Sequence, residues 1–337
     1  MSIALATTTA VALRSAWWAR GPHAQTIWGR YGRARGLVSF EREVLTTPDD
    51  DDLVLDHMAG PADAPRVVLL HGLEGDSGAV YIQGLARGIA AAGMRATVLN
   101  FRSCARDARG KLVPNRRPRL YHSGETKDLD LVVRTLEARE PRTPLLAVGV
   151  SLGGNVLLKW LGEQGARSPV EAAATISVPY DLAAASRHLE RGFARLYAAH
   201  FLKPLKRKAL DILTRFPRET EHINRHRIRF AQTLYAFDDY ATAPLHGFHS
   251  ATDYYSRSSS MRFLGNIEVP TLCVSSEDDP FLPPAALRAA RDHGSEDVRF
   301  AVNKWGGHAA FIWGRWPWRA RYWAEDKVLG WLRSRPK

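Results

Sequence analysis

A serine flanked by glycines is the first feature of the sequence that could carry out chemistry. Residues 149–153 read Gly-Val-Ser-Leu-Gly, the pattern G-x-S-x-G centred on Ser151. An apolar run over residues 145–148 precedes the motif and a helical pattern follows it. Five such residues alone also fit an ordinary turn, but a strand-to-helix context is typical of a nucleophile elbow, which exposes the serine hydroxyl. The sequence therefore predicts that Ser151 is the nucleophile of an acyl-transfer reaction.

A serine nucleophile requires a general base and an acid that orients this base. Around a nucleophile elbow the chain order is serine, acid, histidine, so the base should be a late histidine. His308 follows an apolar run over residues 299–302 in a Gly-Gly-His segment, and we predict that it is the base. Asp279 follows another such run, over residues 271–276. Two residues separate it from the small Ser276 and Pro280 follows it directly, a spacing that favours Asp279 as the acid. Asp278 is the alternative acid.

Acyl transfer also requires two N–H donors that stabilise the developing oxyanion. The residue after the nucleophile supplies one donor and the loop after an earlier strand supplies the other. We predict the backbone amides of Leu152 and Leu73, the latter in the sequence His-Gly-Leu-Glu-Gly over residues 71–75. His71 is interpreted as a residue that braces this loop. No cluster of His, Cys and Asp predicts a metal site.

Alternating strand and helix patterns must position these residues. Apolar runs predict strands over residues 67–70, 95–101, 144–150, 172–177, 271–276 and 298–302. Helical patterns lie over residues 82–92, 126–137, 152–163, 285–292 and 319–333, and an alternating stretch over residues 37–55 predicts a hairpin. Such alternation is typical of an α/β fold, with a mostly parallel sheet between helices and ligands at the carboxyl ends of the strands.

The alternation fails between Pro179 and Met261, where basic helical patterns cover residues 189–213 and 222–238. We interpret residues 179–261 as a helical cap inserted over the sheet. Residues 37–178 and 262–337 then form the α/β core, and residues 1–36 form an N-terminal segment that packs on it. Large apolar side chains of the cap could line an acyl pocket or simply pack the cap. They are Phe193, Leu196, Tyr197, Phe201, Tyr235 and Phe237.

Composition limits the class of protein. The chain has 337 residues, of which 45% are hydrophobic and 24% are charged, as expected for a globular protein. No run approaches the roughly 20 apolar residues of a membrane-spanning helix, and the N-terminus lacks the basic start of a signal peptide, so we expect a cytoplasmic protein. Two cysteines, Cys104 and Cys273, do not make a disulfide framework.

A net charge of +12 could indicate nucleic-acid binding, but the basic residues are spread over residues 102–119, 187–229 and 315–335. Spread charges favour a solvated basic surface over a nucleic-acid site. Attraction to acidic substrates, or transient contact with an anionic membrane surface, is the lesser alternative.

Seven short segments together resemble the YheT-like group, also called the AB-hydrolase 4 group, of the α/β-hydrolase superfamily. They lie at residues 22–26, 71–75, 100–104, 121–126, 149–155, 278–281 and 306–308, and Tyr-His-Ser-Gly-Glu-Thr at 121–126 is particularly specific. The resemblance implies an α/β-hydrolase fold and a Ser/Asp/His hydrolase of small carboxylic esters, with relatives that act on acylglycerols and on medium-chain acyl esters. It implies no metal ion and no organic cofactor.

The sequence departs from the group at residues 103–106, which read Ser-Cys-Ala-Arg where the group usually has Gly-Cys-Ser-Gly, and a longer Arg-rich loop follows. This departure weakens any inference about the substrate. Arg102 is interpreted as a structural ion-pair partner of Glu125 or Asp128. An acyltransferase or ester synthase could use the same acyl-enzyme, and a non-catalytic binding protein could keep the same fold. The sequence does not determine the oligomeric state.

Overall fold

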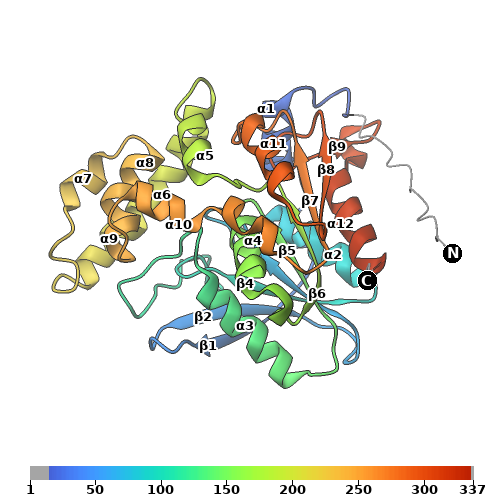
Figure 1. The fold of residues 1–337 in the computed structure, drawn as a ribbon, viewed down its shortest axis with the longest axis horizontal. Helices are drawn as coiled ribbons and strands as arrows, with labels where there is room; N and C mark the ends of the chain where they lie inside the picture. The colour runs from blue at the N-terminus through green and yellow to red at the C-terminus, as the bar shows by residue number, and fades with distance from the viewer. Residues whose placement is uncertain (1–14, 335–337) are drawn as a thin grey trace.

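The computed structural model describes residues 15–334, and its centre is an eight-stranded sheet (Figure 1). The strands lie in the order β1-β2-β4-β3-β5-β6-β7-β8. Only the pairs β1–β2 and β2–β4 are antiparallel, so β2 alone runs against the other strands, which confirms the mostly parallel sheet that the sequence predicts. The strand bounds are β1 Glu41–Thr46, β2 Asp52–Met58, β3 Arg66–Leu70, β4 Arg95–Asn100, β5 Leu145–Val150, β6 Val170–Ile176, β7 Thr271–Ser276 and β8 Val298–Asn303.

Helices cover both faces of the sheet, and each face has its own hydrophobic core. On one face pack α3 (Thr126–Arg139), α4 (Leu152–Gln164) and α11 (Pro284–His293). On the other face pack α2 (Val80–Ala91) and α12 (Trp323–Ser334). Successive residues of β3 alternate between the two cores, which explains why the strands read as continuous apolar runs.

The hairpin expected over residues 37–55 is β1 paired with β2 at the edge of the sheet. A tight turn joins them, in which the amide of Thr47 donates to the carbonyl of Asp51 at 2.9 Å. Asp50 in this turn has a φ of 57°. Aspartate tolerates this conformation better than most residues, which fits the aspartate-rich stretch that the sequence places there.

The terminal helix predicted from residue 319 begins only at Trp323. The residues before it form a small antiparallel ribbon of β9 (Ile312–Trp313) and β10 (Arg321–Tyr322), joined by the 3₁₀ turn Pro317–Arg319. Gly314 turns the chain there with a φ of 114°. Against this ribbon lies α1 (Pro22–Tyr31): the Gln25 side chain accepts from the Ile312 amide at 2.6 Å and donates to its carbonyl at 3.2 Å.

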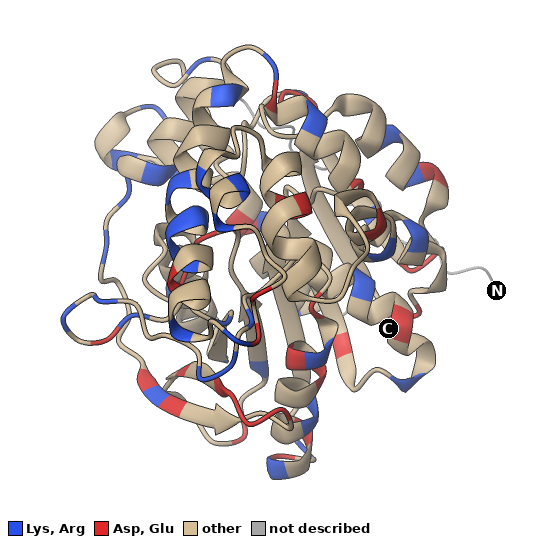
Figure 2. Cartoon of the chain, turned by 90° about the vertical axis from the view of Figure 1, so that its left-hand side faces the viewer, with Lys and Arg blue, Asp and Glu red and all other residues tan. Residues whose placement is uncertain are grey.

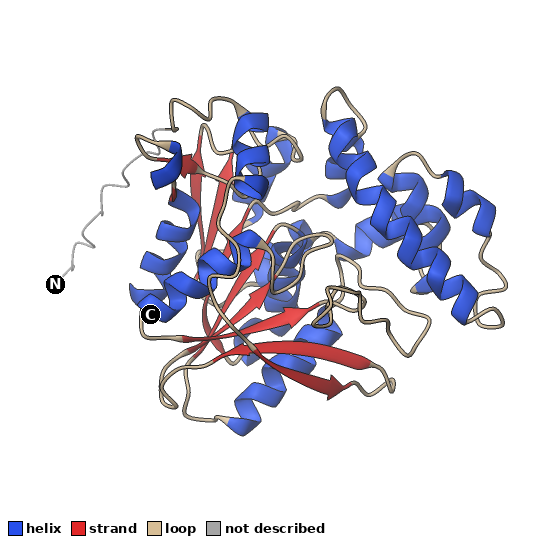
Figure 3. Cartoon of the chain, turned by 180° about the vertical axis from the view of Figure 1, so that it is seen from behind, coloured by secondary structure: helices blue, strands red, loops and turns tan. Residues whose placement is uncertain are grey.

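The chain between β6 and β7 forms a separate group of helices, which lies to one side of the sheet (Figure 3). It comprises α5 (Leu182–Leu189), α6 (Ala194–Arg215), α7 (Arg225–Phe230), α8 (Leu234–Phe237), a π-helical turn over Asp238–Thr242, α9 (Ala243–Leu245) and α10 (Ala251–Ser258). The two long helices expected here are therefore interrupted, the first by Gly192, whose φ is 50°. We call these helices the cap; the proposed domain boundaries at residues 36, 178 and 261 stay a prediction.

Within residues 15–334, no helix is both long enough and apolar enough to cross a membrane. The expected cytoplasmic location also stays a prediction.

Candidate active site

Ser151 lies in a strained turn between β5 and α4. Its φ is 54° and its ψ is −120°, a backbone conformation that is costly for any residue with a side chain. A Cβ atom on Gly149 would lie 2.5 Å from the carbonyl oxygen of Gly153, and one on Gly153 would lie 2.5 Å from that of Leu70. Both motif glycines are thus required by close backbone contacts, which hold the serine at the carboxyl end of the sheet.

The structure brings Ser151, His308 and Asp279 together, although 157 residues separate the first two. The Nε2 atom of His308 lies 2.9 Å from the Ser151 Oγ atom. Its Nδ1 atom lies 2.9 Å from Oδ2 and 3.1 Å from Oδ1 of the buried Asp279. A carboxylate only accepts hydrogen bonds, so Nδ1 carries the imidazole proton and Nε2 carries the lone pair that faces the serine hydroxyl.

Asp278 has a different environment from its neighbour. Its Oδ1 atom accepts from the amide of Gly307 at 3.0 Å, one residue before the histidine. Burial raises the pKa of the Asp278 carboxyl. Asp279 instead accepts from the Phe281 amide at 2.9 Å, and the Phe281 ring stacks on that of His308 with 4.0 Å between ring centroids. The contacts to the imidazole therefore favour Asp279 over Asp278.

A threonine of α1, Thr26, holds the backbone of the loop that carries His308. The sequence did not predict this role for Thr26. The Thr26 hydroxyl accepts from the amide of His308 at 2.9 Å. On the other side of the loop, the Ala309 amide donates to the Ser177 hydroxyl at 3.0 Å. The only sequence signal for Thr26 is its place in the segment 22–26 that resembles the YheT-like group. Helix α1 is therefore part of the framework of the site.

The predicted oxyanion donors, Leu73 and Leu152, border the same cavity as Ser151. Neither backbone amide donates to an acceptor among residues 15–334. A Cβ atom on Gly72 would lie 3.2 Å from the Ser151 Cβ atom, so the loop before Leu73 passes directly beside the serine. Two free N–H groups beside a serine hydroxyl can bind an oxyanion.

Hydrogen bonds hold the Leu73 loop on both sides. The Tyr81 and Tyr121 hydroxyls accept from the amides of Gly72 and Glu74, both at 2.8 Å. The buried His71 ring accepts from the Phe101 amide through Nε2 and donates to the Gly72 carbonyl through Nδ1. Burial lowers the pKa of His71 to about 4, so the imidazole remains neutral and keeps both bonds. The interpretation of His71 as a loop-bracing residue is confirmed.

A cavity of about 450 Å³ opens above Ser151 between the core, the cap and α1. Most of its lining is apolar, and Ser151 and His308 are among its polar groups. Of the six large cap side chains named from the sequence, five line it: Phe193, Leu196, Tyr197, Phe201 and Phe237. Tyr235 does not line it; its hydroxyl lies 3.1 Å from that of Thr252. A cavity of this size and lining suits a small apolar ligand with one reactive polar group.

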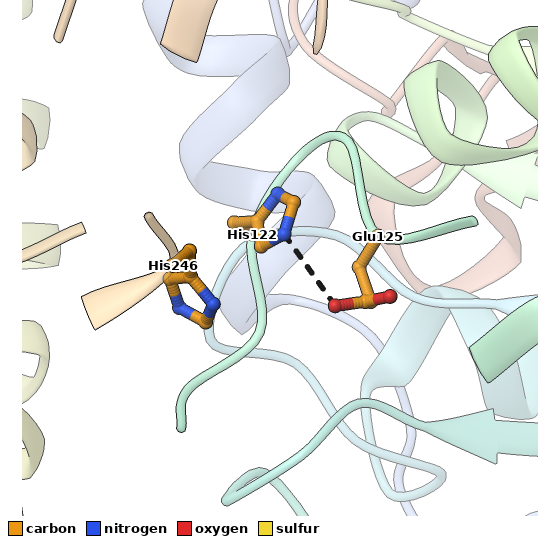
Figure 4. Close-up of side chains that lie close together, drawn as sticks. All are labelled: His122, Glu125 and His246. Carbon is orange, nitrogen blue, oxygen red and sulfur yellow. Dashed lines mark ion pairs between the residues drawn. The ribbon is translucent and has the colours of Figure 1, made fainter. Parts of the chain in front are cut away.

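His122, Glu125 and His246 also lie close together, where the cap meets the core (Figure 4). Their potential ligand atoms lie within 4.8 Å of one another. However, Arg119 already forms an ion pair with the Glu125 carboxylate, and the His122 Nδ1 atom accepts from the Gly124 amide. The proton of His122 is then on Nε2, which faces Glu125 at 3.4 Å. The carboxylate charge of Glu125 and the Nδ1 lone pair of His122, which a metal ion would need, are therefore already engaged by other groups.

Arg102 forms a buried ion-pair network. Its guanidinium donates to Asp128 at 2.7 and 2.8 Å and also pairs with Asp49 and Asp51. Of the two partners that the sequence allowed, Asp128 is right and Glu125 is wrong, because Glu125 pairs with Arg119. Arg102 therefore fixes the β1–β2 turn to α3 and lies outside the cavity lining.

Comparison with known proteins agrees with this geometry. Residues 65–315 match the family model described as the alpha/beta hydrolase fold. The chain belongs to the α/β-hydrolase family. This α/β hydrolase is 36% identical over 313 residues to the protein named "Putative esterase YheT" of Escherichia coli, which covers 92% of this chain and 89% of the relative. The resemblance to the YheT-like group is thus confirmed.

Two further similarities are informative. The α/β hydrolase is 30% identical over 332 residues to phospholipase ABHD3 of Bos taurus, covering 93% of this chain and 75% of the relative. Its fold is similar to that of an esterase from Exiguobacterium antarcticum, with a TM-score of 0.55, 16% identity, and coverage of 87% of this chain and 98% of the other.

Proposed function

We propose that the protein hydrolyses carboxylic esters through an acyl-enzyme on Ser151. Its family and its named relatives make it an enzyme of the esterase and lipase type. The observation that carries the finer proposal is the continuous series of hydrogen bonds from Ser151 through His308 to Asp279 at the bottom of an apolar cavity.

In the first half of the reaction, the Ser151 Oγ atom attacks the ester carbonyl carbon while His308 Nε2 takes the hydroxyl proton. The negative charge develops on the carbonyl oxygen, where the amides of Leu73 and Leu152 can donate to it. Asp279 stabilises the imidazolium that forms. The carbon–oxygen bond to the alcohol then breaks, and His308 returns its proton to the departing oxygen.

In the second half, water attacks the acyl carbon of the ester on Ser151. His308 takes a proton from this water, and its return to Ser151 Oγ releases the carboxylic acid and restores the enzyme. His308, which moves the proton in both halves, already contacts Ser151 and Asp279 by hydrogen bonds.

The apolar lining of the cavity supports a short- or medium-chain acyl ester, or a monoacylglycerol, as substrate. The esterase and phospholipase names of the relatives fit this class of compound. p-Nitrophenyl esters of increasing acyl-chain length serve as model substrates, and the rate profile across them defines the preferred acyl chain.

The test is turnover of these esters by the wild type and by Ser151→Ala. We expect a loss on the order of a million-fold in kcat, because the serine and histidine act as a unit. A variant that keeps the wild-type rate would contradict the proposal. Product analysis with added ethanol distinguishes hydrolysis from transfer of the acyl group to an alcohol.

A further inference from the structure

Four large apolar side chains are exposed at the mouth of the cavity. Ile27 and Tyr31 of α1 are 42% and 64% exposed. Phe193 and Leu196, at the start of α6, are 48% and 61% exposed. All four also border the cavity above Ser151, so they surround its opening. We call these four residues the mouth collar.

Helix α1 and the start of α6, which carry the two halves of the mouth collar, contact each other although they are far apart in the sequence. The ring of His23 in α1 lies 4.4 Å from that of Phe193, and its Nδ1 atom lies 3.1 Å from the Tyr197 hydroxyl of α6. Figure 1 shows α1 and α5 at the same end of the molecule. The mouth collar is therefore one apolar surface around a cavity opening. Exposed apolar patches of this kind mark interaction sites.

Exposed basic residues lie on the segments that carry the mouth collar, which are α1 and residues 182–207. The exposed bases on these segments are Arg30, Arg187, Arg191, Arg195, Lys203 and Arg207, and none forms an ion pair with a residue in the range 15–334. Helix α1 contains no acidic residue, and Glu190 is the single acid over residues 182–207. Figure 2 shows the cap side of the molecule, where Lys and Arg lie on several helices. The surface around the opening is thus apolar at its centre and cationic at its edge.

We propose that the mouth collar docks on an anionic lipid surface, from which acyl-ester substrates enter the cavity; the second part rests on the proposed function. Apolar side chains enter the boundary of a bilayer while arginine and lysine attract its negatively charged headgroups. Because the opening lies at the centre of the collar, a docked molecule would present the path to Ser151 directly to the lipid. The substrate would then leave the bilayer without crossing bulk water.

Flotation with lipid vesicles tests the docking. We expect the wild type to bind vesicles made of equal parts phosphatidylglycerol and phosphatidylcholine, to bind pure phosphatidylcholine vesicles far less, and to be released by salt. Ile27→Ser and Leu196→Ser should each lower binding roughly ten-fold by removing a buried apolar contact. The matched control is Phe230→Ser: Phe230 is 61% exposed on the cap but does not border the cavity, and this variant should bind as the wild type does.

Charge variants test the cationic edge separately. Arg191→Gln and Arg195→Gln should each weaken binding roughly five-fold, whereas Arg218→Gln, a substitution of an exposed arginine elsewhere on the cap, should have a smaller effect. Equal binding to both kinds of vesicle, or equal effects of collar and control variants, would overturn the proposal. Formation of a dimer through the collar in the absence of lipid, detected by sedimentation, would instead assign this surface to a second copy of the chain.

The Ser151→Ala variant separates the two proposals. It should float with the anionic vesicles as the wild type does, while it hydrolyses no ester. Hydrolysis that survives in Ser151→Ala would contradict the proposed function and leave the docking result standing. Failure to float, together with Ser151-dependent turnover of soluble esters, would contradict the docking alone.

Discussion

At the scale of single residues, two adjacent carboxylates have different roles in the structure. Asp279 contacts the ring of His308, and Asp278 contacts the backbone before it. Asp279→Asn should lower kcat by about 10⁴, because the amide favours the wrong imidazole tautomer. Asp278→Asn should have a much smaller effect on kcat. Turnover of a p-nitrophenyl ester by both variants, with thermal melts as a check on folding, measures this difference; a larger loss in Asp278→Asn would reverse the assignment.

His71 makes a prediction about pH. The folded state lowers the pKa of this buried imidazole from 6.5 to about 4, so below pH 6.5 the unfolded chain binds a proton that the folded chain does not. The free energy of unfolding therefore falls as pH decreases through this window. Between pH 7 and pH 5, His71 should contribute about 2 kcal/mol to this fall.

The pH effect is measured by urea unfolding at both pH values, for the wild type and for His71→Asn. The asparagine lacks the titratable group, so its unfolding free energy should depend less on pH. The same pH dependence in both proteins would show that His71 is not responsible.

The sequence was informative about the site wherever chemistry ties a residue to the end of a strand. Ser151, Asp279 and His308 each follow a strand, and the chain order of such residues is fixed by the topology. The choice between Asp278 and Asp279 depends on the direction of side chains within one turn, which spacing does not give. Thr26 lies 282 residues before His308, so only the folded chain reveals their contact.

At the scale of elements, the elbow between β5 and α4 has no space for a methyl group. Gly153→Ala would place a Cβ atom 2.5 Å from the carbonyl oxygen of Leu70 at the end of β3, so α4 must move away from β3. We expect a loss of about 1–3 kcal/mol in unfolding free energy, typical of overpacking, and a strong loss of activity.

The matched control for the elbow is Gly330→Ala. Gly330 lies on the exposed side of α12, where a Cβ atom has no neighbour within 4 Å. This substitution should raise the unfolding free energy by about 1 kcal/mol, because alanine favours a helix. If both variants had the same stability, the proposed tight contact at the elbow would be wrong.

A buried ion pair connects the cap to the loop that carries Leu73. The Lys208 Nζ atom of α6 lies 2.8 Å from the Glu74 carboxylate, and Glu74 has a φ of 57°. Lys208→Met would leave this carboxylate without its cation, at a cost of about 3 kcal/mol. We also expect a lower kcat, because Glu74 directly follows Leu73, the proposed oxyanion donor.

A double-mutant cycle tests this connection. Glu74→Gln combined with Lys208→Met removes both charges and should restore part of the stability that Lys208→Met loses. Strictly additive losses would show that the two side chains do not interact.

Sequence patterns predicted the core elements more reliably than those of the cap. The inner strands of the parallel sheet are buried on both faces, so they appear as apolar runs whose bounds shift by one or two residues at most. Cap helices contact one another through short, irregular patches, and the breaks at Gly192 and at residues 231–233 have no such signal. The start of α12 was misplaced because Arg319 ends the 3₁₀ turn and residues 321–322 form β10 of the β9–β10 ribbon instead.

At the scale of the whole molecule, three distant parts of the chain form the site together. The core supplies Ser151, Asp279 and His308, the cap closes the cavity, and α1 supports the histidine loop. This arrangement places a hydrogen-bonded serine at the bottom of an apolar cavity whose opening is surrounded by exposed apolar and basic side chains. We infer that Ser151 becomes covalently attached to the acyl group of the substrate.

Reaction with a fluorophosphonate, followed by mass spectrometry of the digested protein, tests this claim most directly. Such a reagent forms a stable phosphonyl ester only with an activated serine. We expect one adduct per chain, located at Ser151, which is lost in Ser151→Ala and strongly slowed in His308→Ala. An unmodified Ser151 in a protein that still hydrolyses esters, or an adduct on another residue, would contradict the account.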